Sequence, residues 1–335
     1  MQNLGMLAKI TGLALTILLI SSCSAKDNSG GSNSDTTEVQ INLQCSDHIK
    51  PMPRPLPSLP ITVTTVSGES VLVSSVDRVI SLAPGVAEII WALGLGDVIA
   101  GKDLVSSYPD SDVAPTVNPG HEVALEMLLS LDPDLVLADA SDENADAVQK
   151  LTDLGIPVVV IPEATSVSEI SPRIIAVAIA LGVKATGDEL ASQTAAKLAL
   201  VSATAKSETK IAFLYLRGNA GVYLIGGKGS GADSIISSLG ARDAGTDLGI
   251  EGFAPLTAEA LAKANPDVLL VMNEGLESVG GIEKLLALPG VSSTSAAQNS
   301  AVIQADDRVL LAFGPQTPQV ISCLAAQLTS FNESA

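Results

Sequence analysis

A tyrosine and an arginine at the end of one predicted strand form the pair best suited to chemistry in this chain. The apolar run Ile211–Leu216 predicts a strand, and Tyr215 and Arg217 stand two positions apart along it. Side chains at that spacing point to the same face of a sheet. A phenol has a pKa near 10, and a neighbouring cation favours the loss of its proton. The spacing therefore indicates a phenol beside a permanently charged guanidinium. A core tyrosine is the alternative.

His121 is the histidine best placed to act as a ligand. It follows Pro119-Gly120, a pair that favours an exposed loop. An imidazole there can bind a metal, or it can be an ordinary surface residue. The only other histidine is His48, so the chain cannot build a cage of several histidines. The three cysteines are also too scattered for a zinc ribbon or finger; they are Cys23, Cys45 and Cys323.

A glycine-rich run, Gly226–Gly231, precedes a predicted helix and carries Lys228. Free N–H groups at a helix N-terminus attract anions. Lys228, Gly229 and Ser230 are therefore candidate anion contacts, with a plain strand–helix turn as the alternative. The same run fits a dinucleotide fingerprint only weakly, and Lys228 is not followed by the Ser or Thr of a P-loop. No G-x-S-x-G elbow occurs, so the sequence predicts no enzyme.

Composition excludes further classes of function. The chain has 335 residues, of which 47% are hydrophobic, so two domains with sizeable cores are expected. Eighteen Lys and Arg stand against 37 Asp and Glu, which gives a net charge of −19. Such a chain repels phosphate backbones, so no nucleic-acid partner is expected. Only eight aromatic residues occur, too few for a base-stacking surface.

The N-terminus predicts export. Lys9 precedes an apolar run, Ile10–Ile20, that is too short to span a membrane and is typical of a signal peptide. Ile20-Ser-Ser-Cys23 then resembles a bacterial lipobox, in which the cysteine is lipidated. We therefore expect a signal peptide over residues 1–22 and a lipid on Cys23, with a plain signal peptide as the alternative.

Residues 23–60 are expected to form a tether. Its first part is rich in Ser, Gly and Asn, which favours flexible chain. Its end, Pro51–Pro60, contains five prolines and predicts extended or irregular chain. In an oxidising compartment Cys45 and Cys323 could form a disulfide. A free cysteine in the tail and a core cysteine in the last helix are the alternative.

The remaining chain alternates strands with helices. Two alternating segments around Ser67–Ser70 predict a hairpin. Predicted strands and helices then follow one another, which favours α/β lobes with mainly parallel, covered sheets. The strands are Arg78–Leu82, Leu135–Ala138, Val158–Ile161, Ile211–Leu216 and Val222–Ile225, and the helices are Val86–Leu93, Glu143–Leu154 and Ala232–Leu239.

An internal repeat indicates two similar lobes. Glu126-x₆-Pro-Asp-Leu-Val-Leu matches Glu259-x₆-Pro-Asp-Val-Leu-Leu, and each reads as a helix, a turn and a buried strand. We expect an N-terminal lobe over residues 61–183 and a C-terminal lobe over 208–331. The segment 184–207 between them predicts one long helix, from Asp188 to Lys206. Asp188 and Glu189 in its first turn and Lys206 in its last would suit the helix dipole.

An exported, tethered, two-lobed chain of this kind resembles the substrate-binding proteins of ABC importers for metal chelates and vitamin B12, of class III. The resemblance runs from about Ile61 to Leu328. Several strings narrow it to the haemin-binding lipoproteins of actinobacterial haem importers. They are Arg78-Val-Ile-Ser-Leu, Ala92-Leu-Gly-Leu-Gly-Asp97, Pro119-Gly-His-Glu122, Phe213-Leu-Tyr-Leu-Arg-Gly218, Gly229-Ser-Gly-Ala-Asp233, Gly275-Leu-Glu-Ser-Val-Gly-Gly281 and Leu288-Pro-Gly290.

The resemblance implies roles for the residues singled out above. His121 and Tyr215 would be the axial ligands of the haem iron, and Arg217 would hydrogen-bond the tyrosine. Both residue types are established ligands of haem iron. Haem b is then a transported ligand and not a catalytic cofactor. The family also implies docking on a permease through one glutamate on each lobe, here Glu126 and Glu259.

Two further expectations concern the cargo. Haem carries anionic propionates, so Lys228, Gly229 and Ser230 become candidate propionate contacts. Gln316 stands where many relatives carry an arginine, so one propionate contact is expected to be missing. A different cargo, an iron-siderophore or a cobalamin, is the alternative. A siderophore pocket needs cations and aromatic residues, and a cobalamin pocket in this fold uses aromatic walls; this chain is poor in both.

The sequence as a whole predicts a receptor outside the cytoplasm. It would be a monomer, anchored to the cell membrane as a lipoprotein. It would deliver its cargo to an ABC permease and the associated ATPase subunits without performing chemistry on it.

Overall fold

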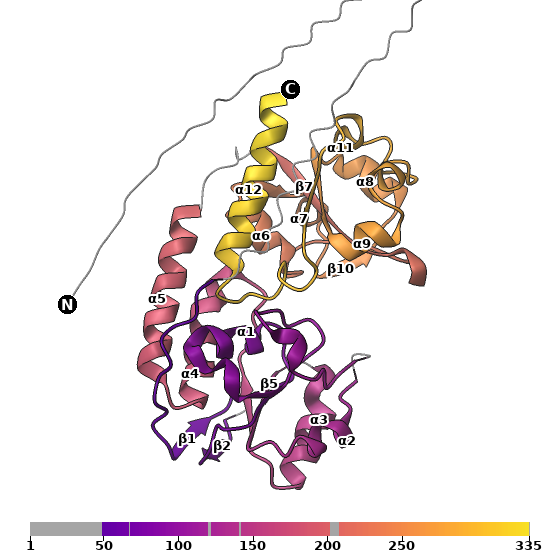
Figure 1. Cartoon of the computed structure of the whole chain (residues 1–335). Helices are drawn as coiled ribbons and strands as arrows, with labels where there is room; N and C mark the ends of the chain where they lie inside the picture. Colours follow the sequence, from indigo (N-terminus) through magenta and orange to yellow (C-terminus); the bar gives the residue numbers. More distant parts are fainter. Residues whose placement is uncertain (1–48, 67, 120–121, 141, 202–207, 335) are drawn as a thin grey trace, which may run out of the picture. The chain divides into compact units, whose positions relative to one another are not determined.

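The computed structural model describes residues 49–66, 68–119, 122–140, 142–201 and 208–334 (Figure 1). The expected signal peptide, Cys23, Cys45 and His121 lie outside the described residues. Within them the chain forms two α/β lobes joined by one long helix. This confirms the fold class expected from the sequence. Figure 1 colours the N-terminal lobe indigo to magenta and the C-terminal lobe orange to yellow.

The N-terminal lobe contains a hairpin and an all-parallel sheet. The hairpin pairs β1 (Ile61–Thr64) with β2 (Ser70–Val73), as alternation and turn chemistry predict. The sheet has the order β4-β3-β5-β6, and all its pairs are parallel. Its strands are β3 (Val79–Ser81), β4 (Ile99–Gly101), β5 (Leu135–Asp139) and β6 (Val158–Ile161). Every residue of β5 is buried, as expected of a strand covered on both faces.

Helices and short helical turns connect these strands. They are α1 (Val86–Ile90), η1 (Trp91–Leu95), η2 (Gly96–Val98), η3 (Ser111–Val113), α2 (Leu125–Ser130), α3 (Asp142–Asp153), η4 (Val167–Glu169) and α4 (Ile170–Ala180). Gly94 has φ 81° and ends the regular helical path within η1, as its place after an apolar helix predicts.

The C-terminal sheet is mixed, with three parallel strand pairs and two antiparallel ones. Its order is β10-β8-β7-β11-β12, with β9 also paired to β7. The strands are β7 (Lys210–Arg217), β8 (Val222–Gly226), β9 (Arg242–Asp243), β10 (Phe253–Pro255), β11 (Val268–Met272) and β12 (Val302–Ala305). β7, β9, β11 and β12 run parallel, whereas β8 is antiparallel to both β7 and β10. The turn from β7 to β8 is short, and short turns can join only antiparallel neighbours.

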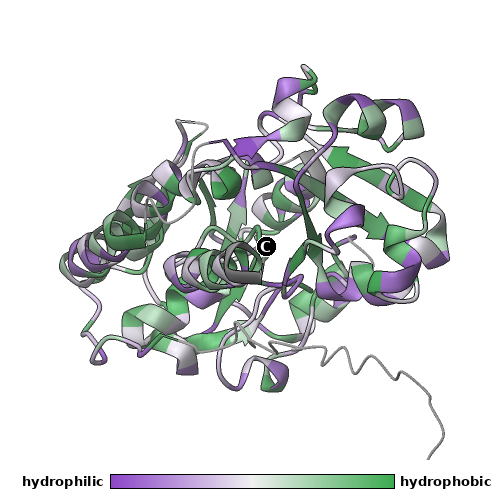
Figure 2. Ribbon diagram, turned by 90° about the horizontal axis from the view of Figure 1, so that it is seen from above, coloured by the Kyte–Doolittle hydropathy of each residue, from purple (hydrophilic) through white to green (hydrophobic). Residues whose placement is uncertain are grey.

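Helices also cover the C-terminal sheet, and α6, α7 and α9 contact β7. They are α6 (Ala232–Ser238), α7 (Ala244–Asp247), α8 (Ala258–Ala264), α9 (Asn273–Ser278), α10 (Ile282–Leu286), α11 (Ser295–Gln298) and α12 (Thr317–Ser334), beside the short turn η5 (Gly218–Ala220). Figure 2 shows hydrophobic residues concentrated on the strands and on one side of the helices.

The linking helix, α5, spans Lys184–Val201. It packs against α4 of the N-terminal lobe and against α12 of the C-terminal lobe. The expected start at Asp188 is wrong, because the helix begins one turn earlier, at Lys184. No acidic residue lies in the first turn. Lys184 stands there instead and bonds Asp188 one turn later, Nζ to Oδ2 at 2.7 Å. This i,i+4 pair is local support for a helix whose buried face, not its dipole, fixes its position.

Both lobes repeat one local structure, as the internal repeat predicts. After α2, the Asp134 carboxylate accepts the N–H of Arg78 at 3.2 Å, and after α8, Asp267 accepts the N–H of Lys210 at 2.9 Å. The side chains of Arg78 and Lys210 also cap the C-terminal ends of α2 and α8. Arg78 Nε donates to Leu131 O at 2.7 Å, and Lys210 Nζ donates to Ala264 O at 2.7 Å. A cation that meets the carbonyls at a helix C-terminus is favourable.

The end of the expected tether belongs to the folded unit. Pro51–Pro60 forms no helix or strand, in agreement with its prolines. Its backbone nevertheless bonds the N-terminal lobe, with Met52 N donating to Ala92 O at 2.8 Å and Ser58 N donating to Gly182 O at 2.9 Å. Arg54 also forms an ion pair with Asp97. The Pro51–Pro60 stretch is therefore irregular, as expected, and it is also bound to the lobe through N–H groups that lie between its prolines.

Candidate functional site

Tyr215 and Arg217 share one face of β7, as the strand alternation predicts. Leu214 and Leu216 are buried, whereas Tyr215 and Arg217 are partly exposed. Opposite them on β8, Tyr215 pairs with Leu224 and Arg217 with Val222. The buried leucines hold the strand in register, so the tyrosine and the arginine are presented together at its carboxyl end.

The Tyr215 ring lies between a cation and another aromatic ring. The Arg217 guanidinium carbon is 4.6 Å from the centre of the Tyr215 ring. The Phe253 ring meets it edge-on, with centroids 6.0 Å apart and planes at 66°. Phe253 is 43% exposed and lies on β10, so it adds apolar surface beside the phenol. The contact of arginine with tyrosine seen here is a cation–π contact. The hydrogen bond expected from the family resemblance stays a prediction.

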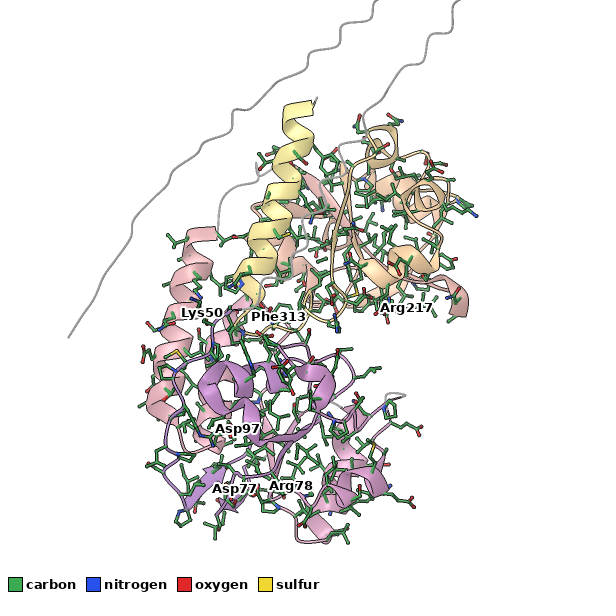
Figure 3. The ribbon with its side chains drawn as sticks, viewed as in Figure 1. Lys50, Asp77, Arg78, Asp97, Arg217 and Phe313 are labelled. Atoms are coloured by element: carbon green, nitrogen blue, oxygen red, sulfur yellow. The ribbon has the colours of Figure 1, made fainter. Side chains whose placement is uncertain are left out.

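Arg217 is held by two partners through its two terminal nitrogens. Its Nη2 is 3.0 Å from Asp307 Oδ1, and its Nη1 donates to Leu216 O at 2.9 Å. The Asp307 side chain is only 6% exposed, and its Oδ2 accepts the backbone N–H of Glu274 at 2.8 Å. Figure 3 labels Arg217.

Sequence reasoning missed Asp307, although a signal for it exists. Strands β7, β11 and β12 are parallel neighbours, and they end at Arg217, Met272 and Ala305. Residues just beyond the carboxyl ends of parallel strands gather at one edge of the sheet. Asp307 lies two residues past the end of β12. The alternation of strands and helices could have pointed to it once the strand order was known.

The glycine-rich loop does not offer the free N–H groups expected of it. Gly229 N donates to Asp233 Oδ2 at 2.9 Å, and Gly231 N donates to Asp233 Oδ1 at 3.1 Å. Ser230 N donates to Gly227 O at 3.0 Å. The Ser230 side-chain oxygen is buried and faces the interior. Asp233 therefore occupies the place that an external anion would take, and only the exposed Lys228 side chain is left as a candidate contact.

A cluster of buried charges lies where the last segment of the chain meets the N-terminal lobe. Glu88 on α1 is 2% exposed and accepts the N–H of Gln316 at 2.7 Å. Arg173 on α4 is also 2% exposed and donates to Ala312 O at 3.2 Å. Burial raises the pKa of Glu88 to about 8, although the Gln316 N–H and the Arg173 charge oppose that rise. Burial likewise raises the pKa of Asp103 and lowers that of Arg173.

Gln316 is part of this junction. It is 3% exposed, and its side-chain nitrogen donates to Ser107 O at 3.3 Å. The segment that carries it is therefore fixed by both its backbone and its side chain. The expected absence of one propionate contact at this position stays a prediction.

Glu126 and Glu259 occupy equivalent places, as the repeat predicts. Each is exposed and stands in the first turn of its helix, α2 and α8. Both carboxylates are thus presented to solvent. Docking through them stays a prediction.

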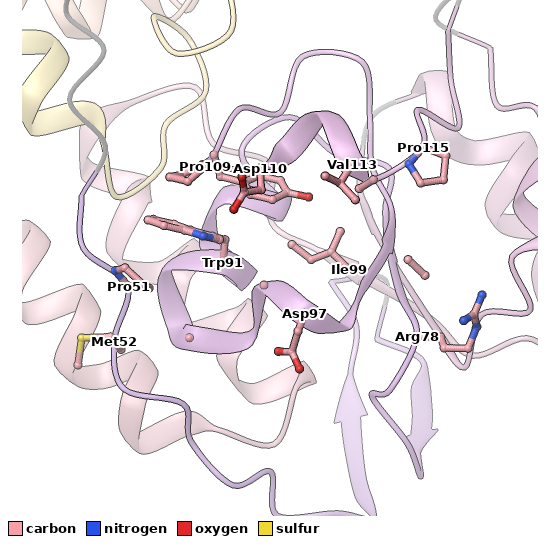
Figure 4. Close-up of a pocket in the computed structure, with 15 residues that line it drawn as sticks. Pro51, Met52, Arg78, Trp91, Asp97, Ile99, Pro109, Asp110, Val113 and Pro115 are labelled. Carbon is pink, nitrogen blue, oxygen red and sulfur yellow. The ribbon is translucent and has the colours of Figure 1, made fainter.

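A pocket with a volume of about 800 Å³ lies on the N-terminal lobe, and Tyr215 does not line it (Figure 4). Trp91 and Tyr108 contribute its aromatic surface, and Asp97 and Asp110 its carboxylates. All of its lining residues lie between Pro51 and Pro115, so it includes none of the site residues of β7.

Two further findings concern the expected disulfide and the membrane. Cys323 on α12 is disulfide-bonded, but both other cysteines lie outside the described residues. The pairing of Cys323 with Cys45 therefore stays a prediction. In the described part of the chain, none of the helices combines the length and the apolar character needed to cross a membrane.

The chain is similar to known binding proteins over most of its length. The periplasmic binding protein family matches residues 79–309. The uncharacterized ABC transporter substrate-binding lipoprotein YvrC of Bacillus subtilis (strain 168) is 29% identical over 80% of this chain and 85% of its own. A vitamin B12-binding protein of Vibrio campbellii is 26% identical over 61% of this chain and 73% of its own.

Among the solved structures similar to this chain are several haem-binding proteins. The haem-binding protein HmuT is 33% identical, with a TM-score of 0.79 over 84% of this chain and 95% of its own. Variants of HmuT with an arginine, a histidine or a tyrosine replaced by alanine match at the same score. The periplasmic haem-binding protein RhuT of Roseiflexus sp. RS-1, in apo form, is also 33% identical, with a TM-score of 0.73 over 77% of this chain and 99% of its own. With its two α/β lobes and its long linking helix, the chain belongs to the periplasmic binding protein family.

Proposed function

We propose that this chain is an extracytoplasmic haem receptor of an ABC importer. It would bind haem b through axial ligation by His121 and Tyr215 and pass it to the permease. The observation that carries the proposal is the Tyr215–Arg217 pair at the end of β7, with the guanidinium 4.6 Å from the ring centre. The HmuT variants support it, because the tyrosine and the arginine replaced in them are also two positions apart.

The chemistry of the pair fits ferric haem. Ferric iron is a hard ion that favours an anionic oxygen ligand. A cation beside a phenol favours the ionised form that such a bond needs. Arg217 keeps its charge at any physiological pH. Phe253 offers an exposed aromatic face next to the phenol, suited to the apolar porphyrin.

The proposal is tested by titrating haemin into the soluble chain that starts after Cys23, beside Tyr215→Ala and His121→Ala. A saturable Soret band at one haem per protein, altered in both variants, is the expected result. A band unchanged in both variants would place the haem elsewhere. No saturable band at all would discard haem as the cargo.

Cobalamin is the second candidate cargo, because curated relatives of this chain include vitamin B12-binding proteins. The two cargoes make opposite demands on Tyr215. A ligand to haem iron cannot be replaced by phenylalanine without loss. A cobalamin wall needs only the aromatic ring. Cobalamin binding that survives Tyr215→Phe while haemin fails to bind would favour the second candidate.

Docking is proposed to use Glu126 and Glu259. Their equivalent, exposed positions on α2 and α8 support this, because one carboxylate from each lobe would meet the permease. Anchoring is proposed to use a lipid on Cys23 after removal of residues 1–22. Labelling with a radioactive fatty acid tests the anchor, because Cys23→Ser should abolish the label. The receptor is proposed to act as a monomer, which sedimentation checks directly.

Lys228 is proposed to contact a haem propionate. It is exposed in the loop that leads to α6, while the neighbouring N–H groups are already bonded to Asp233. A single exposed cation contributes little, so Lys228→Ala is expected to weaken haemin binding by about twofold to fivefold. Lys263→Ala, an exposed lysine on α8, is the matched control. Identical affinities for the Lys228 variant and the unmodified protein would remove this residue from the site.

A further inference from the structure

The residues around Tyr215 lie at the carboxyl ends of three parallel strands, at one edge of the C-terminal sheet. β7 ends at Arg217, and its neighbours β11 and β12 end at Met272 and Ala305. The chain just past β11 supplies a backbone N–H, from Glu274, and the chain just past β12 supplies the carboxylate of Asp307. Asp307 therefore meets Arg217 because of the strand order, although 90 positions separate the two in the sequence.

Asp307 has a fixed orientation. Its side chain is 6% exposed, and one carboxylate oxygen accepts the Glu274 N–H at 2.8 Å. The other carboxylate oxygen lies 3.0 Å from Arg217 Nη2. Burying a carboxylate is costly unless a cation lies beside it. Arg217 is that cation.

The guanidinium of Arg217 is fixed in turn by contacts at both of its terminal nitrogens. Nη2 meets Asp307, and Nη1 donates to Leu216 O at 2.9 Å. Gly275 lies close on the same side, since an added Cβ there would stand 3.4 Å from Nη1. Two contacts on a planar group define the direction of its plane. The guanidinium carbon consequently lies 4.6 Å from the centre of the Tyr215 ring and not free in solvent.

We propose that Asp307 is a positioning residue for the cargo ligand Tyr215, because it fixes the guanidinium of Arg217 against the phenol. The inference rests on the proposed function and adds a third residue to it. Asp307 touches neither the iron nor the phenol. It acts by keeping the Arg217 charge over the ring whose oxygen would bind the iron. Without it, arginine would retain one anchor and many side-chain rotamers.

The test compares Asp307→Asn with the unmodified protein, Arg217→Ala and the double variant. Asp307→Asn keeps an oxygen that can accept the Glu274 N–H, so it is expected to fold, which circular dichroism verifies. Haemin release to an excess of a competing haem-binding protein is expected to be about threefold to tenfold faster, since Arg217 would lose a partly buried ion pair. The visible charge-transfer band of the tyrosine-ligated ferric haem is expected to shift in the same direction as in Arg217→Ala.

The double variant decides whether Asp307 acts through Arg217. When Arg217 is already alanine, Asp307→Asn is expected to change the release rate no further. Asp307→Glu keeps the charge but lengthens the side chain. It is expected to release haemin at a rate between those of the unmodified protein and Asp307→Asn, and it provides the test if the asparagine variant does not fold. Asp306→Asn is the matched control, because that carboxylate pairs with Arg308 instead.

An unchanged release rate and spectrum in Asp307→Asn would overturn the inference while leaving haem binding intact. An equal effect of Asp307→Asn with and without Arg217 would also overturn it, since Asp307 would then act by another route. If the unmodified protein shows no saturable haemin band, the proposed function fails, and the inference fails with it.

Discussion

Tyr215 differs from an ordinary core tyrosine in what its neighbours leave open. Both leucines beside it on β7 are buried, yet the tyrosine itself is partly exposed and carries a cation against its ring. Phe253 supports the ring from β10 without covering it. At the scale of the residue, the Tyr215 phenol contacts the Phe253 ring and the Arg217 guanidinium.

Tyr215→Phe tests this description without disturbing the packing. The ring keeps its contacts with Arg217 and Phe253, but the oxygen that would bind the iron is lost. We expect haemin affinity to fall about tenfold or more, since losing even a hydrogen-bond partner of a metal ligand lowers affinity by about tenfold or more. Titration followed at the Soret band measures the change.

Tyr223→Phe is the control for that experiment. It removes a hydroxyl group from β8, where Tyr223 pairs with Leu216 and not with Tyr215. Equal losses in the two variants would contradict a specific role for the Tyr215 oxygen.

At the scale of the elements, the junction between α1, α4 and the start of α12 is the most unusual part of the fold. It buries Glu88 and Arg173 and fixes the backbone of Gln316. Thr317 opens α12 beside them and is 1% exposed. Ionisable groups are seldom buried so completely. This junction should therefore make the stability of the folded protein depend measurably on pH.

Glu88→Gln is expected to stabilise the protein more at pH 8 than at pH 5. The folded-state pKa of Glu88, about 8, lies above its ordinary value of 4.5. The stability that Glu88 contributes is thus fully present below about pH 4.5 and is lost as pH rises to about 8. Glutamine stays neutral throughout and avoids this loss. The gain at pH 8 is expected to be on the order of 2 kcal/mol, measured by thermal denaturation at both pH values.

Glu169→Gln is the control at the neighbouring end of α4. That carboxylate accepts the Thr165 N–H at 2.8 Å, and this hydrogen bond lowers the pKa of Glu169. Its charged form is the stable one in the folded state, so glutamine should give no gain at pH 8. A difference between Glu88→Gln and the unmodified protein that is the same at pH 5 and pH 8 would contradict the assigned protonation of Glu88.

The elements themselves could largely be predicted from the sequence, whereas their mutual contacts could not. Hydrophobic periodicity and glycine positions predicted β7, α3 and α6 to within about a residue, because these signals are local. The shared face of Tyr215 and Arg217 could be predicted because both lie on one strand, whereas the predicted role of His121 falls outside the described residues. Asp307 was missed because it depends on the order of three strands. The occupied N–H groups of the glycine-rich loop were missed because Asp233 folds back onto them.

At the scale of the whole molecule, the internal repeat places one exposed glutamate on each lobe. Glu126 and Glu259 stand in the first turns of α2 and α8, and each helix is followed by the same Pro-Asp turn. A partner that grips both lobes at once could recognise this repeated arrangement.

Charge reversal separates docking from binding. Glu126→Lys and Glu259→Lys are expected to leave haemin affinity unchanged and to reduce haem uptake by cells about tenfold or more. The family resemblance implies that the two glutamates meet arginines of the permease, which a lysine would repel. Glu283→Lys is the matched control, since Glu283 is also exposed in the first turn of a short helix, α10. Uptake that is normal in both lobe variants would refute docking through these residues.

One apolar cluster contains residues of both lobes, among them Ile89 of α1, Phe213 of β7 and Leu324 of α12. Phe313 belongs to it and is 2% exposed (Figure 3). A shared core makes each lobe lose buried surface if the other unfolds. The protein should therefore melt in a single cooperative step, with equal calorimetric and van 't Hoff enthalpies. The same sharing means that neither half, expressed alone, should form a stably folded protein, so any trimmed version for study must keep both.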